Sequence, residues 1–337
     1  MKKHKIISIL LTTVIATSLT ACGSGSSDNS NTSVTLNLDM SVPITSSWGV
    51  AAETFASEIE EKTEGRYKIK IYTNSELAGG SQAKDLEMLQ SGDIDIGIFG
   101  TLTMSSGDIR IAMPAMPWLF TDFDDAYQSM QGEGGELVKE VVSGIGVHPL
   151  AFGISGFRQL FNNVHEVKTP ADLAGLKIRV PGNSMYVDLF KTLGADPVTM
   201  NSSELYTALS QGAVDGQENP ADMTVTQKFC EVLTYMTPWN YSCEHIILST
   251  SENVWDSLSD EDKEIFQAAA DTAMAAQVKA AKERNSDYMK QLTDDYGIQV
   301  YELSDQELQA FKDKAAPIYD QYKEIMGEDL YKAFGLE

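Results

Sequence analysis

Apolar and polar positions follow two patterns along the chain, one typical of β-strands and one typical of amphipathic helices. Alternation with a period of two predicts a strand, whereas apolar residues three and four positions apart predict a helix face. In the first half, the patterns predict strands at 34–40, 67–72 and 94–99 and helices at 48–62 and 83–90. In the second half, they predict a strand at 176–180 and helices at 185–193 and 203–211. This alternation indicates an α/β fold.

One short motif occurs in both halves of the chain. Leu89–Asp95 and Leu209–Asp215 share the pattern L-x-x-G-x-[I/V]-D, 120 residues apart. In each copy the glycine, Gly92 or Gly212, ends a predicted helix. Because the motif has the same place in each half's order of elements, it indicates two similar lobes.

The last third of the chain predicts long helices instead of alternating elements. Ser259 is a suitable N-cap for a helix over 260–294, which contains no glycine or proline. Thirty-five helical residues span roughly 50 Å, so we expect this helix to cross both lobes. A second helix is predicted over 305–326, with a bend at Pro317.

The first residues predict an export signal. Three lysines precede an apolar run at 6–19, which is shorter than the roughly 20 residues of a membrane-spanning helix. The following Leu19-Thr20-Ala21-Cys22 resembles the bacterial lipobox. We therefore expect a cleaved signal peptide over 1–21, lipid on Cys22 and a flexible Gly/Ser/Asn-rich tether over 22–33. A short membrane anchor is the alternative.

Charge and cysteine content narrow the classes of partner. The formal net charge is −24, and it becomes three units more negative if Lys2, Lys3 and Lys5 are removed with the signal. This charge argues against nucleic acid and anionic membrane surfaces as partners, but not against a small anion bound among local cations. Cys230 and Cys243 are the cysteines left after Cys22, and they are either one disulfide or two buried free thiols.

The segment from Gly175 to Pro220 contains the strongest candidate binding chemistry. Arg179 lies in an apolar strand, and a VDGQENP turn follows about forty residues later. The chain has five arginines against twenty lysines, so an arginine among apolar residues indicates a need for its planar guanidinium. A guanidinium can bind a carboxylate through two parallel hydrogen bonds, which a lysine cannot do. The segment therefore predicts a carboxylate-binding site.

No motif in the sequence indicates catalysis. The chain has no G-x-S-x-G, no H-E-x-x-H and no phosphate-binding glycine loop. His148, His165 and His245 lack the spacing of metal ligands, so we expect neither a metal site nor a cofactor. A secreted hydrolase with two carboxylates that meet only in the folded protein is the enzyme alternative, because sequence spacing cannot show such a pair.

Several phrases together resemble one family. They are KTEGRYKIKIY, SGDIDIGIF, GFRQLFNN, LKIRVPGNSM and LGADPVTMNSSELYTALSQGAVDGQENP, with the lipobox before them and the long helix after them. This combination is similar to the DctP family, the extracytoplasmic solute-binding proteins of TRAP (tripartite ATP-independent periplasmic) transporters. The resemblance implies a two-lobed α/β protein of the periplasmic-binding-protein type, which closes on an organic acid and delivers it to a membrane permease.

The resemblance also implies domain limits and a state of assembly. We expect lobe I to comprise 34–155 and about 245–284, and lobe II to comprise 156–244 and about 285–337. We expect a lipid-anchored monomer outside the cytoplasmic membrane, with TRAP permease subunits as partners. An ABC-type or sensory binding protein with the same two lobes is an alternative, which the long helix and the VDGQEN turn disfavour.

Three residues match the family's ligand clamp. Arg179 matches the arginine that binds the ligand carboxylate, with a structural role inside the lobe as its alternative. Arg158 matches a second arginine, with a salt bridge as the alternative. Asn219 matches an amide of the site, and it is also a candidate N-cap before a helix with Pro220 at its first position.

Further candidates lie near the predicted crevice between the lobes. Each is a ligand contact or an ordinary packing or turn residue: Trp48, Phe99, Thr101, Ser202, Trp239, Asn240 and Tyr241. Ser202 and Gly182 differ from the aromatic and the asparagine that relatives often have there, so the ligand of a particular relative cannot be transferred. The resemblance favours a sugar acid such as a uronate or aldonate, with a C4-dicarboxylate, an oxoacid or a sulfonate as alternatives.

Overall fold

The computed structural model describes residues 33–336, which form one compact unit. The expected signal peptide, the lipidation site Cys22 and all of the tether except Ser33 lie outside the described residues. Within the described part of the chain, every helix is too short or too polar to cross a membrane.

Ten strands of the described residues form a mixed sheet in the order β2-β1-β3-β9-β4-β7-β5-β6, while β8 pairs with β4 and β10. The strands are β1 (Val34–Met40), β2 (Tyr67–Thr73), β3 (Ile96–Gly100), β4 (Val147–Asn162), β5 (Lys177–Val180), β6 (Asp196–Thr199), β7 (Gly216–Pro220), β8 (Tyr235–Thr237), β9 (Cys243–Ser251) and β10 (Gln299–Val300). Each end of the sheet is a parallel group, β2-β1-β3 or β7-β5-β6, and the antiparallel strands β9 and β4 join the two groups.

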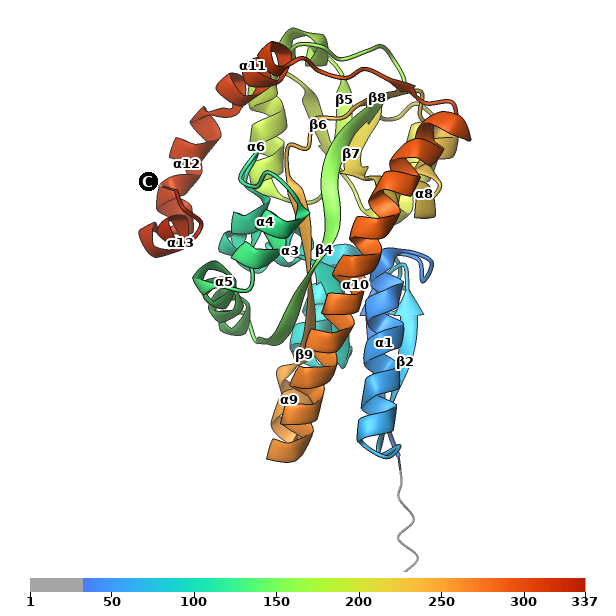
Figure 1. The fold of residues 1–337 in the computed structure, drawn as a ribbon, viewed down its shortest axis with the longest axis vertical. Helices are drawn as coiled ribbons and strands as arrows, with labels where there is room; N and C mark the ends of the chain where they lie inside the picture. The colour runs from blue at the N-terminus through green and yellow to red at the C-terminus, as the bar shows by residue number, and fades with distance from the viewer. Residues whose placement is uncertain (1–32, 337) are drawn as a thin grey trace, which may run out of the picture. The chain divides into compact units, whose positions relative to one another are not determined.

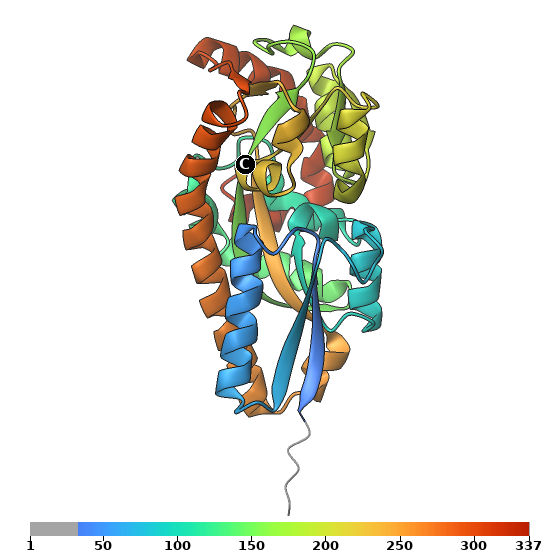
Figure 2. The same ribbon diagram turned by 90° about the vertical axis from the view of Figure 1, so that its right-hand side faces the viewer.

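Helices cover both parts of the sheet (Figures 1 and 2). The α-helices are α1 (Ser47–Lys62), α2 (Gln82–Ser91), α3 (Thr101–Met104), α4 (Phe123–Ser129), α5 (Glu133–Gly144), α6 (Ser184–Leu193), α7 (Ser202–Ser210), α8 (Ala221–Thr226), α9 (Glu252–Ser257), α10 (Asp260–Asp294), α11 (Asp305–Ala315), α12 (Pro317–Met326) and α13 (Glu328–Ala333). Short 3-10 helices are η1 (Ile109–Ala115), η2 (Pro170–Leu173) and η3 (Phe229–Val232).

β4 is the element that joins the two lobes. Its first part pairs with β9, and its last part pairs with β7 and β8. The pairing with β9 is irregular between Ile154 and Gly156, where Gly156 has a φ of 137° that other residues rarely adopt. Gln277 of α10 compensates for this irregularity, because its side chain accepts a hydrogen bond from Ile154 N (3.0 Å) and donates one to Ile154 O (2.8 Å).

α10 runs beside both lobes, as Figure 1 shows in orange. It packs on α1 and β4 and also on α8. Its buried face near the first lobe consists of Phe266, Ala269, Ala270 and Ala273, and the alanines allow α1 to approach closely. The expected bounds 260–294 are confirmed, and Ser259 Oγ accepts from Asp262 N (3.1 Å) as an N-cap.

The repeated motif has the same structural role in both lobes. Asp95 Oδ2 accepts from Asn37 N in β1 (2.7 Å), and Asp215 Oδ2 accepts from Lys177 N in β5 (2.8 Å). The backbone N–H of each aspartate donates in turn to the carbonyl of the same strand residue. The final aspartate of the motif therefore connects the strand after the helix to the neighbouring parallel strand, and the repeat reflects two similar lobes.

The helices and strands predicted from periodicity agree with the structure within two residues at each end, but the VDGQENP segment, which was expected to be a turn, forms strand β7 over Gly216–Pro220. Gly92 has a left-handed conformation (φ 82°) at the end of α2, as expected, and Pro317 separates α11 from α12. The terminal helices contact both halves of the chain, because α12 packs on α6 and η1 and α13 packs on α5. The strand patterns of β4 and β9 were not recognised in the sequence, since both strands are buried along almost their whole length and do not alternate.

Two buried carboxylates lie behind the loop that joins β2 to α2. Asp39 Oδ2 accepts from Leu77 N (2.9 Å), and Asp85 Oδ2 accepts from Ser75 Oγ. Both side chains are fully buried, and within residues 33–336 neither Oδ1 atom has a hydrogen-bond partner. Burial raises the pKa of Asp85 to about 7. The hydrogen bond from Ser75 opposes this shift, and the nearby Asp39 adds a smaller increase.

Asp85→Asn is expected to stabilise the protein at high pH. The folded pKa of Asp85 lies above its unfolded value, so its contribution to stability is present below about pH 4 and is lost as the pH rises through about 7. Asparagine stays neutral, so the variant's gain in unfolding free energy should be about 1–3 kcal/mol larger at pH 8 than at pH 5. Urea unfolding at both pH values measures this, with the exposed Asp287→Asn as the control. An equal effect at the two pH values would contradict the assignment.

Candidate functional site

A small cavity lies between the lobes. Its volume is about 20 Å³, which is roughly the space of one water molecule. The residues around it come from α1, α2, α3, the joining strands and the second lobe: Trp48, Gln82, Leu102, Thr103, Arg158, Arg179, Pro181, Ser202, Asn219, Met223 and Glu244. The structure therefore brings together five of the candidates from the sequence, namely Arg179, Arg158, Asn219, Trp48 and Ser202.

Arg179 is a buried cation without a carboxylate partner. Its Nε and Nη2 atoms donate to the Met200 carbonyl oxygen (3.0 and 2.7 Å), and its side chain is almost fully buried. Among residues 33–336, no partner is found for Nη1 and no carboxylate lies within salt-bridge distance. Burial lowers the pKa of Arg179 to about 10, an effect that nearby Glu218 opposes. The guanidinium retains free N–H groups beside the cavity.

Arg158 is held by carboxylates from both neighbouring strands. In β4, its Nε and Nη2 donate to the Glu218 carboxylate of β7, and its Nη1 donates to Glu244 Oε2 of β9. Nη2 also donates to the Glu218 carbonyl (2.7 Å) and to Asn219 Oδ1 (3.0 Å). Burial alone would lower the pKa of Arg158, but Glu218 and Glu244 raise it well above its ordinary value. The salt-bridge alternative for Arg158 is thus present, and ligand contact stays a prediction.

Asn219 does not cap a helix. It lies in β7, where its side chain accepts from Arg158 and donates to Gln217 Oε1. The N-cap of α8 is Pro220, and the helix begins at Ala221. The expected N-cap role is therefore wrong, because the chain remains extended through Pro220 and the amide faces the neighbouring strand.

Polar contacts cross the crevice on one side of the cavity. Gln82 N donates to Asn201 Oδ1 (3.3 Å), and Gln82 Oε1 accepts from Ser202 N (3.2 Å). Ser203 Oγ donates to Gly80 O (2.9 Å) nearby. Ser202 Oγ itself donates to Gln227 in its own lobe (2.7 Å). These hydrogen bonds hold the start of α2 against the start of α7, so the two lobes are in contact.

Trp48 is a core aromatic residue that also lines the cavity. Its indole Nε1 donates to Ser155 Oγ (3.0 Å), and its ring belongs to the hydrophobic core formed by α1, β1 and α10. The same ring lines the cavity, where it provides an apolar wall. Its contact with a ligand is not tested by this geometry and stays a prediction.

The remaining candidates do not line the cavity, and all of them are buried except Asn240, which is exposed. Phe99 packs in the core, and Thr101 begins α3. Trp239 lies in an aromatic cluster, and the side chain of Asn240 accepts from Gln159 (2.6 Å). Tyr241 is connected to the site indirectly, because its hydroxyl donates to the Glu218 carboxylate that also binds Arg158.

Several cavity residues were missed in the sequence. Gln82 follows a loop whose position the sequence does not reveal, and Thr103 lies in the short helix α3 directly after β3. Glu218, which does not line the cavity but binds Arg158, lies within the recognised VDGQENP phrase, and its carboxylate was not assigned a partner. Glu244 had a detectable signal, because a carboxylate in the apolar segment CEHIILSTS requires a buried cation.

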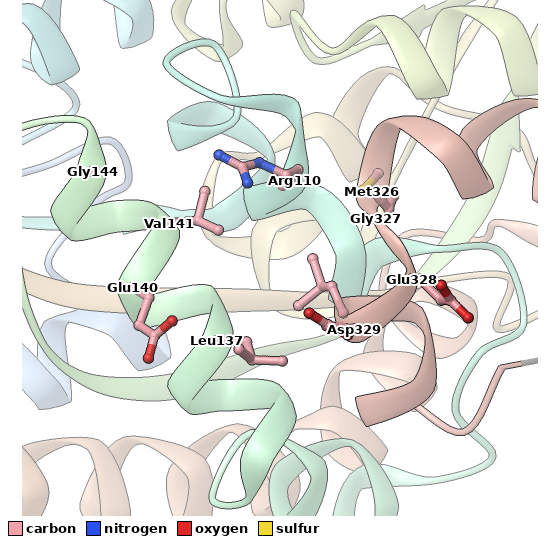
Figure 3. A pocket seen from close by; sticks show the side chains of 10 residues that line it. Arg110, Leu137, Glu140, Val141, Gly144, Met326, Gly327, Glu328 and Asp329 are labelled. Atoms are coloured by element: carbon pink, nitrogen blue, oxygen red, sulfur yellow. The ribbon is translucent and has the colours of Figure 1, made fainter.

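A larger cavity of about 380 Å³ lies far from these groups, between α5 and the α12–α13 junction (Figure 3). Its only arginine, Arg110, is paired with Asp108 through two nitrogens. Its other charged residues are the acids Glu140, Glu328 and Asp329. This cavity therefore offers no free cation for an anionic ligand, and the smaller cavity is the better candidate site.

The cysteines and histidines have structural positions. Cys230 and Cys243 are buried free thiols, which excludes the disulfide alternative in this structure. His245 is fully buried, and burial lowers its pKa to about 4. His148 stacks on Trp255 with ring centroids 3.8 Å apart. Within residues 33–336, no group of three or more potential ligands could hold a metal ion.

Two α/β lobes, a long helix beside both and a buried guanidinium between them define a solute-binding protein of the periplasmic-binding type. Residues 38–325 match the sequence profile of the DctP family, described as bacterial extracellular solute-binding protein, family 7. The chain belongs to this family. Its members and solved relatives are ligand-binding transport proteins rather than enzymes.

Individual relatives agree with this assignment. A solute-binding protein from Chromohalobacter salexigens is 34% identical, covering 81% of this chain and 80% of its own length. A TRAP periplasmic solute-binding protein from a Polaromonas species, solved with D-erythronate, is 32% identical with a TM-score of 0.85, covering 90% of this chain and 99% of its own. A Shewanella oneidensis relative, solved with succinate, is 27% identical with the same TM-score, covering 90% and 98%. Solved relatives that share this fold are thus bound to different ligands.

Arg158→Met is expected to destabilise the fold strongly. The substitution leaves Glu218 and Glu244 buried without their cation, which typically costs about 3–5 kcal/mol of unfolding free energy. Urea unfolding measures the loss, and Arg110→Met, which removes an exposed ion pair with Asp108, is expected to cost below about 1 kcal/mol. Equal losses of unfolding free energy in the two variants would show that the buried ion cluster stabilises the fold no more than the exposed ion pair does.

Proposed function

We propose that this protein captures an organic acid between its lobes through Arg179 and delivers it to a TRAP permease. The observation that carries the proposal is the buried guanidinium of Arg179, whose partners are limited to one carbonyl among the described residues. A buried unpaired cation costs several kcal/mol, and a carboxylate bound through two hydrogen bonds would offset that cost. Arg158 and Asn219 support the same ligand group from β4 and β7.

Capture requires the lobes to move apart. The cavity has about 20 Å³, whereas small-molecule sites usually enclose about 300–1,000 Å³. We assign the motion to the crossing strands near Ile154 and Gly156, with lobe I formed by 34–155 and about 245–284 and lobe II by 156–244 and about 285–337. Closure then restores the contacts of Gln82 with Ser202 across the crevice.

The ligand we favour is a sugar acid, such as an aldonate or a uronate. Neutral polar groups of Asn219, Gln82 and Thr103 line the cavity beside the two arginines, and such groups suit hydroxyl groups. The relative solved with D-erythronate supports this class. A C4-dicarboxylate, an oxoacid or a sulfonate in the same role is the alternative. Trp48 provides an apolar wall for the carbon chain.

Replacement of Arg179 is expected to abolish capture. Arg179→Ala should weaken binding by about thirty-fold to several thousand-fold, and Arg179→Lys should also weaken it because the two-pronged geometry is lost. A thermal-shift panel of uronates, aldonates, dicarboxylates, oxoacids and sulfonates on refolded protein measures this, since ligand at 100 times its dissociation constant adds about 2.7 kcal/mol. Arg110→Ala is the control. Unchanged shifts in both Arg179 variants would refute the clamp.

We propose that the mature protein is a monomer, held outside the cytoplasmic membrane by lipid on Cys22. The lipobox-like Leu19-Thr20-Ala21-Cys22 supports the anchor. Cys22→Ser is expected to block lipid attachment and signal cleavage at this site, since the thiol is the acceptor of the lipid. Metabolic labelling with a radioactive fatty acid measures this. Equal incorporation into the parent and into Cys22→Ser would contradict the anchor.

A further inference from the structure

Glu244 places a second, negatively charged group at the same cavity as Arg179. The side chain lies in β9 and is 4% exposed. Its Oε2 accepts from Arg158 Nη1, but among residues 33–336 no donor is found for its Oε1. Because Glu244 lines the cavity, its free carboxylate oxygen is available to accept a hydrogen bond from a group that enters there. The cavity therefore contains one free cationic donor, Arg179 Nη1, and one free anionic acceptor, Glu244 Oε1.

The position of Glu244 Oε1 is fixed from two sides. Arg158 holds the other carboxylate oxygen, and Gly100 lies against Oε1. A Cβ atom at Gly100 would be 2.4 Å from Oε1, which is far inside contact distance. The backbone of Gly100 has a φ of −67°, which any residue can adopt. A side chain at this position would therefore have to displace the Glu244 carboxylate, although the backbone conformation itself would accept one.

The charges around the cavity balance before a ligand arrives. Arg158 and Arg179 are positive, and Glu218 and Glu244 are negative. A ligand with one carboxylate adds a single buried negative charge next to Arg179. A second carboxylate in this small volume would add another negative charge close to Glu244, with no free cation to pair with it among the described residues.

We propose that Glu244 determines the ligand class: it accepts a hydrogen bond from a ligand hydroxyl group and rejects a second carboxylate, so the site selects hydroxylated monocarboxylates. This inference rests on the proposed function, because Arg179 must bind the single carboxylate. A ligand hydroxyl group fits Glu244 better than a ligand ammonium group does, because Arg158 already pairs with the Glu244 carboxylate. Apart from Arg158, Arg179 and Glu244, the residues that line the cavity are uncharged. Selectivity against a ligand that leaves a buried polar group unpaired or opposed is typically large.

Four-carbon acids of similar size test the proposal. Calorimetric titration of refolded protein compares D-erythronate, which carries hydroxyl groups, with butyrate, succinate and 4-aminobutyrate. We expect the parent to bind D-erythronate at least about tenfold more tightly than each of the others. Tighter binding of succinate or of 4-aminobutyrate than of D-erythronate would overturn the assignment of Glu244.

Glu244→Gln removes the charge while it keeps the shape of the side chain. We expect the preference for D-erythronate over succinate to fall about tenfold or more, because the acceptor becomes neutral and no longer repels the second carboxylate. An unchanged preference in this variant would overturn the proposal. Gly100→Ala is a second variant that displaces Oε1 but retains its charge. It should weaken D-erythronate binding about tenfold without any gain for succinate, and an unaltered affinity would count against the proposal.

Arg179→Ala separates failure of this inference from failure of the proposed function. If that variant loses all binding while Glu244→Gln leaves the preference unchanged, the clamp stands and the role of Glu244 falls. If the parent binds none of these acids and none of the larger sugar acids, both the clamp and the role of Glu244 are wrong. Circular dichroism spectra that match the parent establish that each variant is folded.

Discussion

The ion cluster of Arg158 with Glu218 and Glu244 is the interaction on which the site depends. Arg158 lies in β4, and its two partners lie in β7 and β9 on either side of it. The cluster therefore connects three neighbouring strands beside the cavity. A buried guanidinium between two carboxylates must keep nearly all of its hydrogen bonds, because each lost contact leaves a charged group without solvent. This requirement makes the strand segments around Arg158, beyond the irregular pairing near Ile154 and Gly156, a stiff support for the site.

Arg179, which lines the same cavity as Arg158, lacks such carboxylate partners among the described residues. Its guanidinium is as deeply buried as that of Arg158, but a single backbone carbonyl accepts from it. The contrast between a fully paired arginine and an unpaired one, beside the same cavity, indicates which of them is reserved for a ligand. The local fold maintains this difference, because the Glu218 and Glu244 carboxylates are already engaged by Arg158 and Tyr241.

The sequence predicted the regular elements well and the site only in part. The bounds of β1, α1 and α10 follow from periodicity and capping, which are local properties. β4 and β9 escaped notice because strands that are buried on both faces lose the alternation that marks a strand. Arg179 was predicted from its place in an apolar strand, Arg158 and Asn219 were predicted from resemblance, and all three line one cavity. Gln82 and Glu244 could not be placed, because their positions depend on how distant strands and loops meet.

Candidate aromatic residues illustrate the same limit. Trp239 and Tyr241 were chosen because their segment was expected to cross between the lobes, and they instead belong to a buried aromatic cluster. Sequence position gave the neighbourhood correctly, but it did not give the direction of the side chains. Tyr241 nevertheless affects the site through its hydrogen bond to Glu218, a relation that only the three-dimensional arrangement reveals.

The balance of two positive and two negative side chains around the cavity has a kinetic consequence. Arg158, Arg179, Glu218 and Glu244 together have no net charge, and the chain as a whole carries a charge of −24. An approaching anion is therefore repelled at long range, and Arg179 can bind it only once it has entered the crevice. Dissolved salt screens the repulsion over about 8 Å at physiological ionic strength, so salt should speed the encounter rather than slow it. Diffusional encounter is thus separated from recognition, which takes place inside the crevice.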